Sequence, residues 1–131
     1  DWSQEYELGA PLGEVLLRPT RIYVQECKTL IERFDVRGLI HITGGGFHEN
    51  IPRALPDGCG VVLDRGSWPV PPIFEFLQAR GGLSDTDMEN TFNNGLGMIA
   101  IVPAADAEAA AAAVGGHVVG RVTNTEGVVV R

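Results

Sequence analysis

Residues 41–53 read HITGGGFHENIPR, and they join two different kinds of structure. The apolar run at 39–42 predicts a strand within residues 36–43, which ends abruptly at three glycines. Residues 50–55 predict a short helix, with Pro52 tolerated in its first turn. A helix that began earlier, at the glycines, would have to absorb Pro52 as a kink. The stretch leaves this boundary open, but it indicates a domain that mixes strands and helices.

The glycines at 44–46 are a candidate anion site. Glycine allows positive φ and a close approach of the backbone, so unpaired N–H groups can bind a phosphate. Thr43 could add a hydroxyl, Asn50 an amide and Arg53 a positive charge. A tight strand-to-helix turn explains a glycine triplet without any ligand, and turn geometry is the more frequent reason for one. No Gly-Lys-Ser/Thr follows, so the stretch is not a Walker A loop.

Periodicity and punctuation predict the other elements. Helices are expected at residues 22–34, 71–80, 84–91 and 104–114, and strands at 60–64, 96–102, 118–122 and 127–130. Ser84 and Asp87 predict a capping box, and the turn containing Asn124 predicts a hairpin of the last two strands. This irregular order favours an α+β fold, a layered α/β/α domain with a mixed sheet, over a doubly wound parallel sheet.

Composition limits the classes of function. A chain of 131 residues fits one domain, and 44% hydrophobic with 21% charged residues is typical of a globular protein. The net charge of -7 would repel a nucleic acid. No apolar run reaches about 18 residues and no leader pattern is present, so we expect a cytoplasmic protein with neither a nucleic-acid nor a membrane partner.

A second glycine segment and a few single residues complete the candidates. Asn93 and Gly95 precede the strand at 96–102 and Gly97 lies at its start. A bulge, a close neighbour or a helix cap is the favoured explanation for them, and a ligand amide is the alternative. His41, inside an apolar run, is more often a core histidine than a base. His117, among glycines, is expected to be exposed.

The sequence gives no pattern for a metal site or a disulfide. His48 and Glu49 lack a third ligand at metal spacing, so no metal is expected to bind this chain directly. Cys27 and Cys59 show no CxxC spacing, and two buried thiols are favoured over a disulfide.

Three stretches in this order resemble the C-terminal half of the aminoimidazole ribonucleotide synthetases, the phosphoribosylformylglycinamidine cyclo-ligases. They are LLRPTRIYV at 16–24, HITGGGF with ENIPR at 41–53, and FN with GLGM at 92–98. The resemblance runs from about residue 13 to the end. It implies the C-terminal domain fold of this superfamily for residues 14–131, with residues 1–13 as a linker and the N-terminal ATP-binding domain absent.

The resemblance also implies a reaction. ATP with Mg²⁺, bound mostly by the N-terminal domain, would drive ring closure of formylglycinamidine ribonucleotide to aminoimidazole ribonucleotide in purine biosynthesis. The full enzyme would be a homodimer with its active site between domains. By position, the wall of that site would comprise Thr43, Gly44, Gly45 and Gly46, with His41, Glu49, Asn50 and Arg53 as nearby polar groups.

Two alternatives stay open from the sequence. One is a related ATP-dependent phosphotransferase of the same superfamily, and the other is a binding or assembly module in which the glycine loop is only a turn. With half of the site missing, the isolated chain is expected not to turn over.

Overall fold

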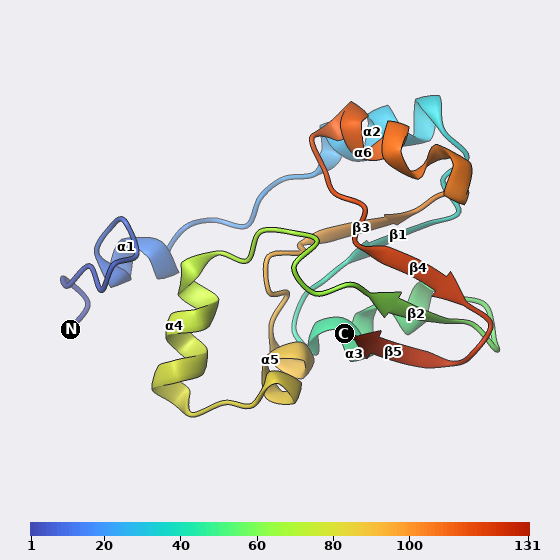
Figure 1. Cartoon of the computed structure of the whole chain (residues 1–131). Coiled ribbons are helices and arrows are strands. Elements are labelled where there is room, and N and C mark those ends of the chain that lie inside the picture. The colour runs from blue at the N-terminus through green and yellow to red at the C-terminus, as the bar shows by residue number, and fades with distance from the viewer.

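The strands form two small sheets in the computed structural model, which describes all 131 residues (Figure 1). In the first sheet, β1 (Gly38–His41) pairs antiparallel with β3 (Met98–Ile101). In the second, β2 (Gly60–Leu63) lies in the centre, antiparallel to β4 (Gly120–Thr123) and parallel to β5 (Gly127–Val130). The fold is thus a mixed α/β domain, and its mixed sheet is the three-stranded one.

The helices lie on two sides of these strands. Helices α2 and α6 pack together over one side, and α3 and α5 contact each other on the opposite side (Figure 1). The α-helices are α1 (Leu12–Leu16), α2 (Val24–Arg33), α3 (Gly46–Asn50), α4 (Pro72–Gly81), α5 (Asp85–Thr91) and α6 (Ala107–Val114). Two 3-10 turns, η1 (Pro52–Ala54) and η2 (Ala104–Asp106), adjoin α3 and α6. The predicted helices and strands are all present, with ends that differ by a few residues.

The boundary around Pro52 has a simple solution. Helix α3 begins at the glycines and ends at Asn50, before Pro52. Pro52 then starts the separate 3-10 turn η1, where its missing N–H costs nothing. The helix therefore needs no kink, and the glycine loop leads directly into α3.

The predicted hairpin of the last two strands is wrong. β4 and β5 are consecutive, but they flank β2 on opposite sides instead of pairing with each other. The turn between them crosses the end of β2 at Gly60, where a Cβ would lie 2.2 Å from the main-chain oxygen of Thr125 and 2.3 Å from that of Gly127. Because Gly60 has no side chain, the chain can pass around the end of the strand, and both edges of the apolar β2 become paired.

The hydrophobic core lies around β1 and β2, and it anchors the start of α3. Phe47 and Ile51 are each 1% exposed, and the Phe47 ring meets Trp68 edge to face at 6.2 Å between centroids. The core cluster comprises Ile40, Ile42, Phe47, Ile51, Val61, Leu63, Trp68 and Leu96. The residue after the three glycines is thus fixed in the core, which limits how far the loop can move.

Cys27 and Cys59 are free thiols, as expected, although each is half-buried and neither is fully buried. No helix of the chain is both long and apolar enough to cross a bilayer.

The predicted capping box at the start of α5 is confirmed. The Asp87 N–H donates to Ser84 Oγ, and the Ser84 N–H and hydroxyl donate to Asp87 Oδ2 at 2.9 and 2.6 Å. These hydrogen bonds, first from the Ser84 hydroxyl and then from its N–H, hold the pKa of Asp87 below its usual value.

We expect Ser84→Ala to raise the pKa of Asp87, because the strongest of these donors is lost. A lowered carboxyl pKa stabilises the fold above the unfolded value of about 3.9, and this contribution disappears as the pH falls through the lowered folded value. Urea unfolding between pH 2 and 7, with NMR titration of the Asp87 carboxyl, checks both effects. An unchanged Asp87 titration in the variant would contradict the capping-box explanation.

Candidate functional site

The glycine loop, residues 43–46, is exposed to solvent at Gly44 and buried against α5 at Gly46. Gly45 and Gly46 have φ of 92° and 57°, values that L side chains rarely adopt. Gly46 is buried, and a Cβ there would lie 1.9 Å from the main-chain oxygen of Glu89 in α5. Gly44 is exposed, and a Cβ there would meet nothing within 4 Å. The first part of the loop is therefore accessible, while its last glycine is pressed against α5.

Asn50 determines which backbone groups of the loop are free. It is only 4% exposed, and its Nδ2 donates to the carbonyl oxygens of Thr43, Gly44 and Gly46 at 3.2, 3.3 and 2.8 Å. Its Oδ1 accepts from Thr43 Oγ1 at 3.3 Å. The predicted polar contributor Asn50 thus contacts the loop itself.

The consequence for the loop is a separation of its donors from its acceptors. The side chain of Asn50 occupies the carbonyl groups, and the only loop N–H that finds a main-chain acceptor within the loop is that of Gly46, which donates to Thr43 O at 3.1 Å. The N–H groups of Gly44 and Gly45 have no acceptor in the chain. Successive free N–H groups on an accessible loop can bind an anion.

Two charged side chains lie at the edge of the loop. The Glu49 carboxylate rests against Gly45, where a Cβ would lie 2.4 Å from Oε2. Arg53 Nη2 lies 3.6 Å from the same oxygen, and both side chains are about two-thirds exposed. The carboxylate opposes an anion at the loop and Arg53 offsets it, so the free N–H groups carry most of the attraction. Exposed side chains can rotate away, and an exposed pair of this kind contributes little to stability.

A charged cluster behind the loop was not foreseen from the sequence. The Glu89 side chain is 13% exposed, and it bonds Arg65 Nη2 at 2.7 Å and His48 Nε2 at 3.3 Å. Arg65 also lies 3.7 Å from Asp85. The cluster ties α3 to α5 and supports the loop from behind. No local pattern signals it, because Glu89 lies 41 residues from His48 and 24 from Arg65.

The second glycine segment lies beside the first. The N–H of Ile42 donates to Gly97 O at 2.9 Å, which brings the end of β1 next to the start of β3. A Cβ on Gly97 would lie 2.0 Å from the Tyr23 hydroxyl, and one on Gly95 would lie 2.8 Å from Pro69 O. Both glycines therefore admit close neighbours, as the sequence predicts.

The asparagines of this segment make hydrogen bonds within the chain. Asn93 Oδ1 accepts from the Gly95 N–H at 3.0 Å. Asn94 Nδ2 donates to Met88 O in α5 at 3.0 Å, and Asn94 O accepts from Trp68 Nε1 at 2.9 Å. These contacts cap α5 and attach the segment to the core.

The prediction that His41 is a core histidine is wrong. Its side chain is exposed on β1, because Ile40 and Ile42 face the core and the intervening residue points to the other face of the strand. The His41 ring contacts Tyr23 edge to face at 6.2 Å between centroids. His117 is exposed, as predicted.

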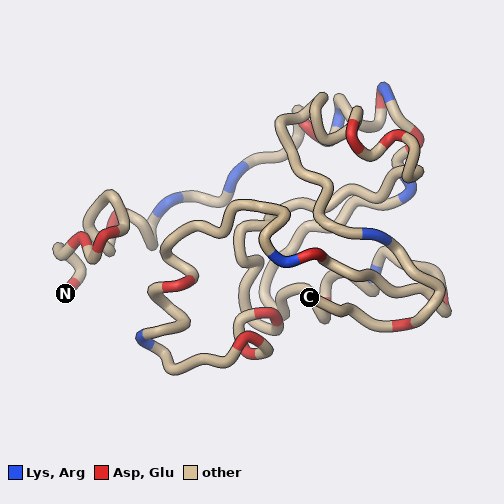
Figure 2. The backbone as a smooth tube through the Cα atoms, in the orientation of Figure 1, with Lys and Arg blue, Asp and Glu red and all other residues tan.

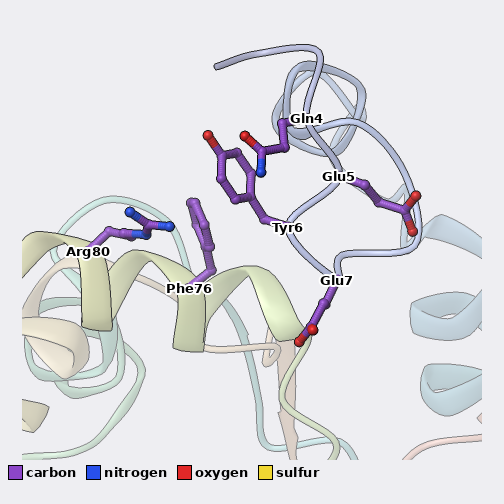
Figure 3. A pocket seen from close by; sticks show the side chains of 6 residues that line it. All are labelled: Gln4, Glu5, Tyr6, Glu7, Phe76 and Arg80. Carbon is purple, nitrogen blue, oxygen red and sulfur yellow. The ribbon is translucent and has the colours of Figure 1, made fainter.

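A separate open hollow of about 550 Å³ lies away from these residues, between the N-terminal segment and α4 (Figure 3). Arg80 lies over the rings of Tyr6 and Phe76 there, at 5.4 and 5.5 Å from their centroids. Figure 3 shows the three side chains side by side, so the Arg80 cation already makes cation–π contacts with both rings. None of the predicted site residues lines this hollow.

A family model and several individual proteins that are similar to the chain indicate the same family. The family model described as "AIR synthase related protein, C-terminal domain" matches residues 1–131. Proteins named phosphoribosylformylglycinamidine cyclo-ligase are similar to the chain. That of Shouchella clausii is 48% identical over 128 residues, 94% of this chain and 37% of the relative. Those of Symbiobacterium thermophilum and Acetivibrio thermocellus are 54% and 57% identical over 80% and 74% of the chain, and 30% and 28% of the relatives. The chain thus spans about a third of the length of the relatives it matches.

Proposed function

Since the chain belongs to the family of AIR synthase related protein C-terminal domains, we propose that it is the C-terminal domain of a cytoplasmic, ATP-dependent phosphoribosylformylglycinamidine cyclo-ligase of purine biosynthesis. Within it, the glycine loop at residues 43–46 binds a phosphate group. The proposed phosphate site rests on the hydrogen bonds of Asn50. Its side chain donates to the loop carbonyl groups, and the N–H groups of Gly44 and Gly45 remain free.

The exposed surface supports a larger protein. The chain exposes 8085 Å², whereas a monomer of 14.0 kDa is expected to expose about 6,700 Å². Large apolar side chains contribute to the excess, and Leu17 and Ile22 are 84% and 79% exposed. Surface of this kind is usually covered by another domain or subunit. An ATP-binding domain and a second copy of the enzyme would both provide such cover.

The proposed reaction needs charge stabilisation more than covalent chemistry. ATP would phosphorylate the amide oxygen of formylglycinamidine ribonucleotide, the amidine nitrogen would attack that carbon, and phosphate would leave as the imidazole ring closes. In this chain, the loop N–H groups would hold a phosphate of the bound reactants, and Arg53 would offset its charge. The chain brings no three His, Cys, Asp or Glu side chains together at metal-binding distance. No magnesium step is therefore assigned to its residues.

We expect inorganic phosphate to bind the 131-residue chain at the loop. In an amide-resolved NMR titration, saturable shifts should centre on residues 43–50. Glu49→Gln should strengthen binding a few-fold and Arg53→Gln should weaken it a few-fold, because each changes one charge next to the loop. Gly115 and Gly116, which follow α6 in a separate turn, are the internal control and should not shift.

The absence of shifts at 43–50, or equal shifts at 115–116, would refute a phosphate site on this chain. A companion assay with ATP and formylglycinamidine ribonucleotide should show no release of ADP from the isolated chain. Full turnover would refute the proposal that the site also needs an ATP-binding domain.

A further inference from the structure

Tyr23 is placed at the end of the β1–β3 sheet by a glycine. Gly97 is buried, and its lack of a side chain is what allows the Tyr23 hydroxyl to lie against the first residues before β3. The hydroxyl makes no hydrogen bond within the chain. Since no buried side-chain oxygen or nitrogen lacks a partner, the hydroxyl must reach solvent. The fold thus holds the ring in a fixed place and leaves its polar group free.

His41 extends this free polar surface toward the glycine loop. Its exposed ring contacts the edge of Tyr23 and makes no hydrogen bond of its own. His41 is the last residue of β1, and Thr43 follows it by two residues. The N–H of Ile42, between them, donates to the carbonyl oxygen of Gly97, the residue against which the Tyr23 hydroxyl lies. Tyr23 and His41 therefore lie at the end of the sheet where the chain leads into the glycine loop.

Arg21 adds a positive charge beside Tyr23 and His41, and these three side chains are called the row below. The guanidinium carbon of Arg21 lies 5.4 Å from the centroid of the Tyr23 ring, and its Nη2 pairs with Glu26 in the first turn of α2. The chain as a whole carries a net charge of -7. Figure 2 nevertheless shows basic positions along the stretch between α1 and α2 that contains Arg21.

We propose that Arg21, Tyr23 and His41 bind the sugar part of a phosphate monoester whose phosphate lies on the glycine loop. This inference rests on the proposed phosphate site. The phenol and the imidazole exchange hydrogen bonds with sugar hydroxyl groups, and Arg21 donates to a further oxygen. Free phosphate carries no sugar for these side chains to contact, so the row is expected to distinguish a sugar phosphate from free phosphate.

The test compares two probes, inorganic phosphate and ribose 5-phosphate, by NMR titration of the 131-residue chain. Tyr23→Phe removes only the hydroxyl, and His41→Gln keeps a polar side chain on an exposed site. Each variant should bind ribose 5-phosphate about fivefold more weakly, the effect of one lost hydrogen bond, and should bind inorganic phosphate as before. His117→Gln, an exposed histidine distant from β1 in sequence, is the matched control and should change neither affinity.

The outcomes separate this inference from the site on which it rests. If inorganic phosphate binds but both variants bind ribose 5-phosphate as tightly as the unmodified chain, the row is overturned and the loop site survives. If neither probe binds, both the loop site and the row are overturned. Equal weakening of both probes would show that the variants disturb the loop itself, and this result would also overturn the row as a sugar site.

Discussion

Gly46→Ala is expected to lower the free energy of unfolding by about 3 kcal/mol or more. Gly46 has a φ of 57° and is buried, and the added Cβ would lie 1.9 Å from the Glu89 main-chain oxygen. That oxygen belongs to helix α5, which is held by its capping box and by the Glu89 cluster, so it cannot move away without cost. For a domain whose total stability is about 5–15 kcal/mol, such a loss is severe.

The matched control is Gly44→Ala, two residues earlier in the same loop. A Cβ on Gly44 would meet nothing within 4 Å, and its φ is not positive. Its effect should stay within about 0.5 kcal/mol. Urea unfolding followed by tryptophan fluorescence, in which the buried Trp68 reports the loss of the core, and by circular dichroism measures both variants. If the two unfold at the same urea concentration, α5 does not hold Gly46 as the structure describes.

Asn50→Asp is the second substitution with a large expected effect. It keeps the volume of the side chain but replaces the donor that serves three carbonyl groups with an acceptor. The side chain is 4% exposed, so an ionised carboxylate would be buried among carbonyl oxygens. A loss of about 3 kcal/mol at neutral pH is expected, together with loss of phosphate binding at the loop.

The pH dependence of this variant gives a further test. Burial among carbonyl groups should raise the pKa of the new carboxyl above its unfolded value, and Arg53, whose Nη1 lies 3.5 Å from Asn50 Oδ1 but whose side chain is about two-thirds exposed, offsets only part of this effect. A raised folded pKa means that stability is greatest at low pH and falls as the pH rises through that value. The deficit against the unmodified chain should therefore grow between about pH 4 and 7.

Asn124→Asp is the control, since Asn124 is exposed in the turn between β4 and β5. Its effect should lie within about 0.5 kcal/mol at every pH. A deficit for Asn50→Asp that is no larger than that of this control would show that Asn50 does not hold the loop carbonyl groups.

Elements with a local cause were predictable from the sequence. The capping box of Ser84 and Asp87, the proline before α4 and the glycine after it involve residues within one turn of each helix end. Such contacts form whatever the rest of the chain does, so the pattern specifies them. The stretch at 41–53 likewise predicts a strand, a glycine loop and a helix, and all three are present in this order.

The candidate site was predictable only in part. The glycines and Asn50 were identified as candidates, but the inward position of Asn50 depends on how α3 packs against the core. The exposure of His41 depends on which face of β1 the core covers, and an apolar run does not reveal that face. Glu89 packs against the loop at Gly46 and Tyr23 packs against Gly97, and both come from positions distant in sequence.

The sequence by itself determined the family, the order of helices and strands, and the position of the glycine loop. The tertiary structure alone decided that β4 and β5 flank β2, that Asn50 faces the loop carbonyls, and that Tyr23 lies against Gly97 with its hydroxyl free. The physical reason is the range of the interactions. Caps and turns are stabilised by neighbours along the chain, whereas strand pairing, burial and the free or bonded state of a polar group depend on segments that meet only after folding.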